Sequence, residues 1–397
     1  MPTILGINVA YLFYAIVMVV VGLVLMLLYG FLLSWSERKQ SALMQDRIGA
    51  NRCYIPLPGG KKLILWGFIH NLADATKMVF KENFKPDSND KLLYFLAPFV
   101  AIITAMIGFA VVPLAGMFKP AEFFQAWYLK WIPALPEFFA NNFQGVAWRV
   151  QAAPLNVGLL YVFGIGGLGI FTAMMAGWAS NNKFSLFGAL RAGAQMISYE
   201  ITLGVALLGL IFLYGDVDLF TVVQRQEELW FGVIPKWGVF IQPFAFIIYF
   251  LAALAEAKRI PFDFPEAESE LVSGYFTEYS GFKVLAFMLA EFIEVAFVSS
   301  IMVTLFFGGY SVPWLFANGF HWPWGGVWEL SHATVILLQM VSFIVKLTFA
   351  CWLLQTIRWT LPRIRYDQLM GLSWKRLLPF AIANFIVTVI IVAIGGF

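Results

Sequence analysis

The sequence predicts an all-α polytopic membrane protein with about eight transmembrane helices. Hydrophobic residues make up 61% of its 397 positions and the mean hydropathy is +0.79, whereas soluble globular domains are about 45–50% apolar. Apolar runs of about 20 residues, the length that crosses a bilayer as a helix, recur along the chain. Because lipid forces backbone polar groups into internal hydrogen bonds, such runs predict helices. We therefore treat residues 1–397 as a single integral membrane domain.

Eight apolar runs are separated by polar segments that serve as loops. The first run is too long for the apolar part of a signal peptide and has no basic segment before it, which predicts a retained helix. The predicted spans cover residues 9–35, 92–113, 155–178, 195–214, 238–257, 283–308, 332–356 and 376–396.

Basic residues alternate between the loops and predict the orientation. Loops that follow odd-numbered spans hold 20 of the 26 Lys and Arg residues, and loops that follow even-numbered spans hold five. Positively charged loops stay on the cytoplasmic side. The loops 36–91 and 257–283 are therefore predicted to be cytoplasmic, and both chain termini to lie outside. The segment 114–154 is then a long outer-side insertion.

The first cytoplasmic loop contains more than a plain connection. Within residues 61–82 apolar side chains recur with helical spacing, among them Ile69 and Leu72, while Asp74 and Lys77 fall on the opposite face. This pattern predicts an amphipathic helix that lies in the membrane interface.

The most polar stretch, residues 255–270, carries seven ionisable side chains in sixteen positions, although only 12% of the chain is charged. A carboxylate that faces lipid costs about 2.5–3.5 kcal/mol even on lenient scales. This stretch must therefore lie in water or line a polar cavity, which makes it the first candidate for a functional segment.

Further ionisable side chains fall within or at the edges of the spans. Glu291 and Glu294 are close to one helical turn apart and can share a face. Acids inside a membrane commonly mark proton pathways, and several acids on several helices favour such a path. Structural roles are the alternative, as ion-pair partners near the boundary or, for the lysine, as a snorkelling side chain. The side chains are Glu200, Glu256, Glu291, Glu294 and Lys346.

Several site classes are excluded by composition. Two cysteines, Cys53 and Cys351, are too few for an iron–sulfur cluster or a zinc site. The glycine-rich run 164–167 has no preceding strand and no following Lys, so it predicts close helix packing and not a phosphate loop. We expect no metal site, no cofactor held by this chain alone and no nucleic-acid partner.

Five segments resemble one known family. They are residues 37–51 (ERKQSALMQDRIGAN), 73–82, 188–200 (GALRAGAQMISYE), 255–281 and 358–370 (RWTLPRIRYDQLM). Together they resemble the H subunit of bacterial NADH:quinone oxidoreductase, respiratory complex I, whose mitochondrial relative is NADH dehydrogenase subunit 1. The matches are collinear and fall in every predicted cytoplasmic loop.

The resemblance implies a multi-pass subunit of the bacterial inner (plasma) membrane. Such a subunit forms the membrane-side part of the quinone chamber and begins a glutamate path that couples quinone reduction to proton pumping. Quinone would be the substrate, while FMN and the iron–sulfur clusters belong to partner subunits. Implied partners are the peripheral quinone-site subunits, the small membrane-arm subunits and membrane lipid. The loops 36–91 and 257–283 would face the chamber.

The resemblance also assigns roles to residues, in three groups. Quinone binding falls to Glu37, Arg38, Arg47 and Asp74. An acidic coupling loop comprises Asp263, Glu266, Glu268, Glu270 and Glu278. The proton path comprises Glu200, Glu256 and Glu291, whereas Glu294 and Lys346 receive no role.

The chain departs from the family pattern at a few positions. Ala50 stands where the family usually has Pro, and Ala257–Lys258 replaces the usual Thr–Asn, which adds a cation beside Glu256. Two alternatives are a related subunit of a membrane-bound hydrogenase or of a ferredoxin- or F420-linked complex, and an ion-coupled secondary transporter. A transporter is expected to show repeated halves, and the sequence shows no internal repeat.

Overall fold

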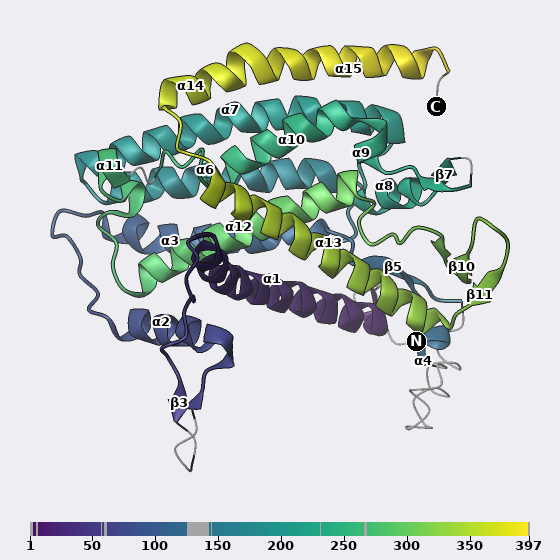
Figure 1. Cartoon of the computed structure of the whole chain (residues 1–397), viewed down its shortest axis with the longest axis horizontal. Coiled ribbons are helices and arrows are strands. Elements are labelled where there is room, and N and C mark those ends of the chain that lie inside the picture. Colours follow the sequence, from purple (N-terminus) through teal and green to yellow (C-terminus); the bar gives the residue numbers. More distant parts are fainter. Residues whose placement is uncertain are drawn as a thin grey trace.

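The computed structural model describes residues 3–4, 7–56, 58, 62–124, 143, 145–230, 232–265 and 268–395. Within these ranges the chain is a bundle of long helices that run roughly parallel or antiparallel to one another (Figure 1). Seven helical segments of the described chain are long and apolar enough to cross a membrane. They are α1 (Val9–Met44), α3 (Lys91–Gly108), α6 (Gly158–Ala179), α7 (Lys183–Tyr214), α12 (Phe282–Phe306), α13 (His332–Thr360), and α14 (Tyr366–Leu372) continued by α15 (Leu378–Ala393). The predicted all-α polytopic fold is confirmed.

The fifth predicted span, 238–257, is broken into two pieces. Helix α9 (Gly238–Ile241) ends at Gln242, whose φ of −131° is not helical, and α10 (Pro243–Glu256) starts afresh. Pro243 lacks an N–H, so it fits the first turn of a new helix better than the middle of a continuous one. The first turn of α1 and the last turn of α15 lie at the same end of the bundle (Figure 1). A chain that crosses a membrane an even number of times has both ends on the same side. The seven long segments alone would be an odd number, so we count the shorter apolar helix α10 as the eighth crossing.

Two helices extend further than hydropathy predicts. Helix α1 continues to Met44, so Glu37 and Arg38 lie on a helix, and α7 already begins at Lys183. The predicted amphipathic helix is confirmed as α2 (Ile69–Phe80), although a short 3-10 turn, η1 (Leu65–Gly67), replaces its first part. The amide of Asn71 donates to the Phe31 carbonyl over 2.8 Å, which attaches α2 to α1.

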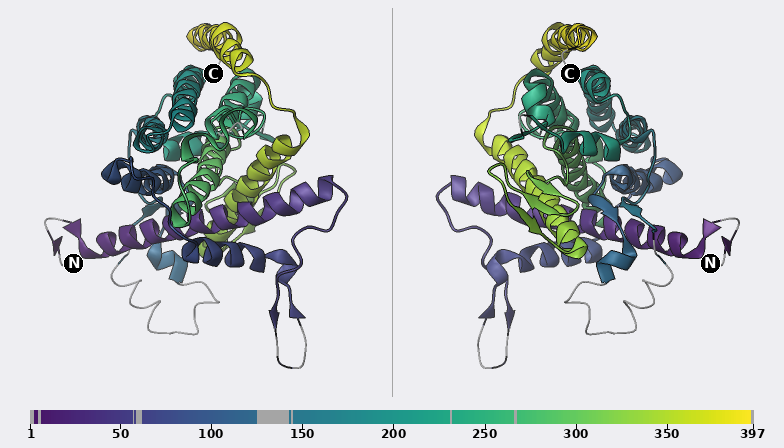
Figure 2. Two further views of the ribbon diagram at one scale, coloured as in Figure 1. Left: turned by 90° about the vertical axis from the view of Figure 1, so that its left-hand side faces the viewer. Right: turned by 90° about the vertical axis from the view of Figure 1, so that its right-hand side faces the viewer.

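Helix α12 is the centre of the bundle. It packs against α1, α3, α10 and α13, and two thirds of its most apolar stretch is buried. Helix α15 lies on the side of the bundle opposite α1, where it covers α7 (Figures 1 and 2). Because α12 carries both Glu291 and Glu294, these acids are held inside the protein and away from lipid.

Short strands and helices join the long helices. The strands form small antiparallel sheets of two or three strands, and the β3–β4 hairpin projects from the bundle beside α2 (Figure 2). Of the predicted outer-side insertion 114–154, residues 125–142 and 144 lie outside the described residues. The strands are β1 (Thr3–Ile4), β2 (Ile7–Asn8), β3 (Ile55–Pro56), β4 (Lys62–Leu63), β5 (Ala115–Phe118), β6 (Trp148–Val150), β7 (Leu229–Trp230), β8 (Ile234–Pro235), β9 (Leu315–Phe316), β10 (Gly319–His321) and β11 (Val327–Glu329). The short helices are α4 (Pro120–Phe124), α8 (Leu219–Gln226) and α11 (Glu268–Leu271), with 3-10 turns η2 (Phe109–Val111) and η4 (Gly274–Phe276) and a π-helical turn η5 (Ser373–Leu377).

Candidate functional site

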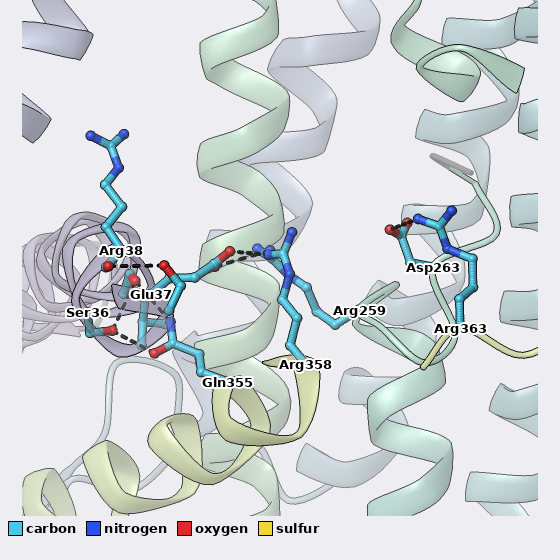
Figure 3. Close-up of polar contacts among 10 residues, drawn as sticks. Ser36, Glu37, Arg38, Arg259, Asp263, Gln355, Arg358 and Arg363 are labelled. Atoms are coloured by element: carbon cyan, nitrogen blue, oxygen red, sulfur yellow. Dashed lines mark hydrogen bonds and ion pairs between the residues drawn. The ribbon is translucent and has the colours of Figure 1, made fainter. Parts of the chain in front are cut away.

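Glu37 on α1 is bound by two arginines from distant parts of the chain. Its Oε1 forms an ion pair with Arg358 in the last turn of α13, and its Oε2 lies 3.4 Å from Nη1 of Arg259, just after α10. Figure 3 shows the Glu37 carboxylate pointing toward these two guanidinium groups. All three side chains are 20% exposed or less. One carboxylate therefore fixes the end of α13 and the segment after α10 against α1.

A cavity of about 340 Å³ opens beside this cluster. Its walls come from α1, α12, the segment after α10, the turn η4 and the end of α13. They combine guanidinium groups with two aromatic rings and a thioether, and the Arg259 guanidinium lies 4.5 Å from the Phe292 ring centre. The lining residues are Ser34, Glu37, Arg38, Arg259, Ser273, Phe276, Met288, Glu291, Phe292 and Arg358.

The four residues predicted to bind quinone are not all at this cavity. Glu37 and Arg38 line it. Asp74 on α2 does not line the cavity, but it pairs over 2.5 Å with Arg38, which does. Arg47 is exposed, and its Nε donates to the Gln45 side chain over 2.7 Å in the turn after α1. The structure thus brings three of the four together.

Three residues predicted to form the acidic loop are tied to different segments of the chain. Asp263 pairs with Arg363 over 3.1 Å (Figure 3), Glu270 pairs with Arg191 on α7, and Glu278 accepts from the Asn182 amide over 2.5 Å. Burial raises the pKa of the Asp263 carboxyl above its ordinary value, although the Arg363 guanidinium acts in the opposite direction.

The remaining two acids of that group are less defined. Glu266 lies outside the described residues, and Glu268 is placed only as the first residue of α11.

A second, smaller cavity lies deeper in the bundle and shares Glu291 with the first. Its volume is about 40 Å³, and Glu256, Lys258, Glu294 and Tyr275 also line it. The Tyr275 hydroxyl donates to Glu291 Oε1 over 2.9 Å, and Lys258 Nζ donates to Glu294 Oε2 over 3.0 Å. Glu291 therefore borders both the large cavity and the inner one.

A third cavity of about 20 Å³ continues from the second toward α7. Glu256 lines both of these cavities, and Glu200 lines the third. Gly166 on α6 also borders both, and a Cβ at this position would lie 3.5 Å from Glu256 Oε1 and 3.7 Å from Glu200 Oε1. Gly164 has no atom within 4 Å of such a Cβ. The predicted role of this glycine run in close helix packing is therefore wrong at these two positions, because Gly166 leaves room for carboxylates and Gly164 faces open space.

Three residues of the predicted proton path thus line one series of adjoining cavities. A water needs roughly 10–15 Å³ of such space, so the inner cavity of about 40 Å³ has room for roughly two or three waters and the third, about 20 Å³, for one. The order along the series is Glu291, Glu256 and Glu200.

Sequence reasoning missed several members of this site. Arg259 and Arg358 have no local pattern that points to Glu37, since they lie far away in the sequence. Lys258 and Glu294 were each seen as ionisable, but their pairing depends on how α10 and α12 pack. The local signals for the inner cavity were the helical spacing of Glu291 and Glu294 and the cation at Lys258 beside Glu256.

Lys346 has a different environment from these acids. Its Nζ donates to the backbone carbonyls of Phe307, Gly309 and Ser311 over 2.8, 3.0 and 2.6 Å, and it lies 4.6 Å from the Trp237 ring centre. The ammonium therefore satisfies carbonyls just beyond the end of α12, which accounts for its burial.

Comparisons with known proteins agree on one family. The profile of the family described as NADH dehydrogenase matches residues 15–389. The H subunit of NADH-quinone oxidoreductase from Bdellovibrio bacteriovorus is 39% identical over 378 residues, which cover 92% of each chain. An H subunit of the Cytophaga hutchinsonii enzyme is 38% identical over 89% of this chain and 90% of its own. The H subunit of the Thermomicrobium roseum enzyme is 38% identical over 93% and 94%, respectively.

Replacing Glu37 by Gln should destabilise the bundle. The change removes the carboxylate shared by Arg259 and Arg358, and breaking a largely buried ion pair costs about 3 kcal/mol. We expect a lower apparent melting temperature of the purified complex, followed by intrinsic fluorescence. The control is Asp367→Asn, because Asp367 pairs with Arg365 where both side chains are at least 67% exposed, and exposed pairs contribute about 0–1 kcal/mol. Equal effects of the two substitutions would contradict this prediction.

Proposed function

The chain belongs to the family of H subunits of NADH-quinone oxidoreductase and is a membrane subunit of complex I, and from this premise we propose two roles for it. It forms the membrane-side part of the quinone-binding chamber, and it begins the glutamate path that couples quinone reduction to proton pumping. The observation that carries this proposal is a series of three adjoining cavities that share glutamates in their walls. Glu291 joins the first to the second, and Glu256 joins the second to the third.

The large cavity suits a quinone head group. Its volume of about 340 Å³ falls in the range of about 300–1,000 Å³ that is usual for ligand pockets. Phe276 and Phe292 offer apolar faces for the ring, and the guanidinium groups offer donors for the quinone oxygens. Reduction takes up two electrons and two protons. The electrons must come from a partner subunit, because two cysteines cannot hold an iron–sulfur cluster.

The glutamates suit a proton path. Carboxyl groups separated by water-sized spaces can pass protons through the intervening waters, and acids inside membranes are commonly used in this way. Coupled carboxyl groups titrate collectively, so a charge change at Glu291 affects Glu256 and Glu200 beyond it. In this proposal, reduction of quinone in the large cavity alters the protonation of Glu291, which borders it.

The acidic loop connects the same cavity to two other elements. We assign Asp263, Glu266, Glu268, Glu270 and Glu278 to a coupling role. The ion pairs from Asp263 to Arg363 and from Glu270 to Arg191 support it, because they link the loop to the segment after α13 and to α7. A change in loop charge would then act on both elements.

The remaining features follow from the same proposal. FMN and the iron–sulfur clusters reside in partner subunits, and this chain contacts the peripheral quinone-site subunits and the small membrane-arm subunits. The segments 36–91 and 257–283 face the chamber from the cytoplasm, and 114–154 lies on the outer side. Family membership argues against an ion-coupled transporter. The named relatives are subunits of an NADH-linked enzyme, which favours that enzyme over a hydrogenase or a ferredoxin- or F420-linked complex.

Arg38→Ala should lower quinone reductase activity in membranes about tenfold or more, because a hydrogen bond to a charged group contributes about 1.5–3 kcal/mol. Glu256→Gln should abolish pumping, because an amide cannot accept and release the proton. NADH–ferricyanide activity, which bypasses the quinone, should persist in both. Lys39→Ala is the control for Arg38, since Lys39 contacts Asn51 on the surface. Unchanged turnover and pumping in both variants would overturn the proposed function.

Gly166→Ala should slow pumping several-fold. The added methyl would face the carboxylates of both Glu256 and Glu200 and displace water between them. Gly164→Ala is the matched control on the same helix, because its methyl meets open space. Both substitutions raise helix propensity by about 1 kcal/mol, so helix stability does not distinguish them. Identical pumping rates in the two variants would contradict a water-filled connection at Gly166.

Neutralising the acidic loop should weaken coupling. We expect at least one of Glu266→Gln, Glu268→Gln and Glu270→Gln to lower the number of protons pumped per quinone reduced, measured in reconstituted vesicles. Glu329→Gln is the control, since Glu329 is exposed in β11 at the opposite end of the protein. If each of the three loop variants kept wild-type stoichiometry and quinone reduction, the coupling role of the loop would be excluded.

A further inference from the structure

The buried ion pair between Lys258 and Glu294 lies at the middle of the cavity series. The Lys258 side chain is 7% exposed and that of Glu294 is 19% exposed, with 3.0 Å between Nζ and Oε2. Both residues line the inner cavity together with Glu256 and Glu291. The Lys258 ammonium is thus held in the cavity that Glu256 and Glu291, two residues of the predicted proton path, also line.

The backbone at Lys258 supports a specific role for this side chain. Its φ is +51°, in the left-handed region that favours glycine. A glycine would end α10 with less strain, yet the chain places there a lysine that reaches across to α12. Strained positions of this kind occur where the surrounding structure holds a residue for a purpose.

The groups that face the ammonium come from all the elements around it. Glu256 belongs to α10, Glu291 and Glu294 to α12, and Tyr275 of η4 donates to Glu291. Burial alone would lower the pKa of Lys258, but the carboxylates of Glu294, Glu291 and Glu256 raise it above its ordinary value. The next charged groups are Arg259, near Glu294, and Glu200, near Glu256. Among the residues that line the inner cavity, Lys258 is the cation that the three carboxyl groups share.

We propose that Lys258 is a positioning residue of the proton path: Glu294 holds its ammonium between Glu291 and Glu256, where it permits one of them to be ionised while the other carries the proton. A proton that moves from one carboxyl to the next leaves a carboxylate behind. A buried carboxylate without a nearby cation holds its proton more tightly, so without the ammonium both groups would favour the protonated form and pass protons on more slowly. This inference rests on the proposed function.

The two single substitutions should shift the pH dependence of pumping in opposite directions. Lys258→Met removes the cation, so Glu256 and Glu291 release protons less readily, and the pumping profile should move up by about one pH unit. Glu294→Gln removes the counter-ion, so the ammonium favours ionised Glu256 and Glu291, and the profile should move down. At pH 7 each variant should pump several-fold more slowly than the wild type.

Two further variants keep the test informative if Lys258→Met fails to assemble. Lys258→Arg retains the charge and should keep the wild-type profile. Lys258→Met combined with Glu294→Gln removes both charges, and its profile should lie between those of the single variants. The matched control is Lys236→Met, because Lys236 pairs with Glu228 over 2.8 Å at the opposite end of the protein, outside the path.

Pumping is followed in membrane vesicles by quenching of a pH-sensitive dye between pH 6 and 8.5, with NADH–ferricyanide activity reporting assembly. Opposite shifts for Lys258→Met and Glu294→Gln support the inference. Unshifted profiles in all variants, with any loss proportional to lost assembly, would mean a purely structural ion pair and overturn it. The Glu256→Gln variant distinguishes a failure of the proposed function from a failure of the role of Lys258. If it abolishes pumping while Lys258→Met changes nothing, the proposed function stands and only the role of Lys258 fails.

Discussion

The arrangement of this protein depends on one constraint, which is that a charge buried in a membrane bundle needs an opposite charge beside it. Breaking such a pair leaves a charge that water no longer solvates. Around the candidate site, the largely buried pairs join elements that are distant in the sequence, so they fix these elements relative to one another. These pairs are Glu37 with Arg358 and Arg259, Asp263 with Arg363, and Glu294 with Lys258. The pairs of Glu37 and Glu294 also line the cavities.

Hydropathy predicted most of the fold because each long helix corresponds to one continuous apolar segment of the sequence. It misplaced the end of α1 and the start of α7, because the extensions 36–44 and 183–194 contain charged and polar residues that hydropathy assigns to loops. It also missed the break at Gln242, since α9 and α10 form one continuous apolar run. For the site, the family resemblance named the glutamates and Arg38. The two arginines that pair with Glu37, Arg259 and Arg358, could not be inferred, because they lie 222 and 321 positions away from it in the sequence.

The glycines of α6 show why a local motif can be misread. A run of small residues in a membrane helix commonly permits a neighbouring helix to approach. Successive residues of a helix point in different directions, however, and the face decides the role. Gly166 faces the carboxylates of Glu256 and Glu200, whereas Gly164 faces open space. The missing side chain at Gly166 leaves volume between two acids, which in the proposed path is occupied by water.

Lys258 and Arg259 are adjacent in sequence and serve different cavities. Arg259 pairs with Glu37 at the large cavity, and Lys258 pairs with Glu294 in the inner one. The strained backbone at Lys258 directs these two neighbours to opposite partners. A negative charge that develops on a quinone in the large cavity would attract Arg259 and compete with Glu37 for it. In the proposed path, this dipeptide therefore places one cation beside the quinone and the other in the cavity that Glu291 and Glu256 line.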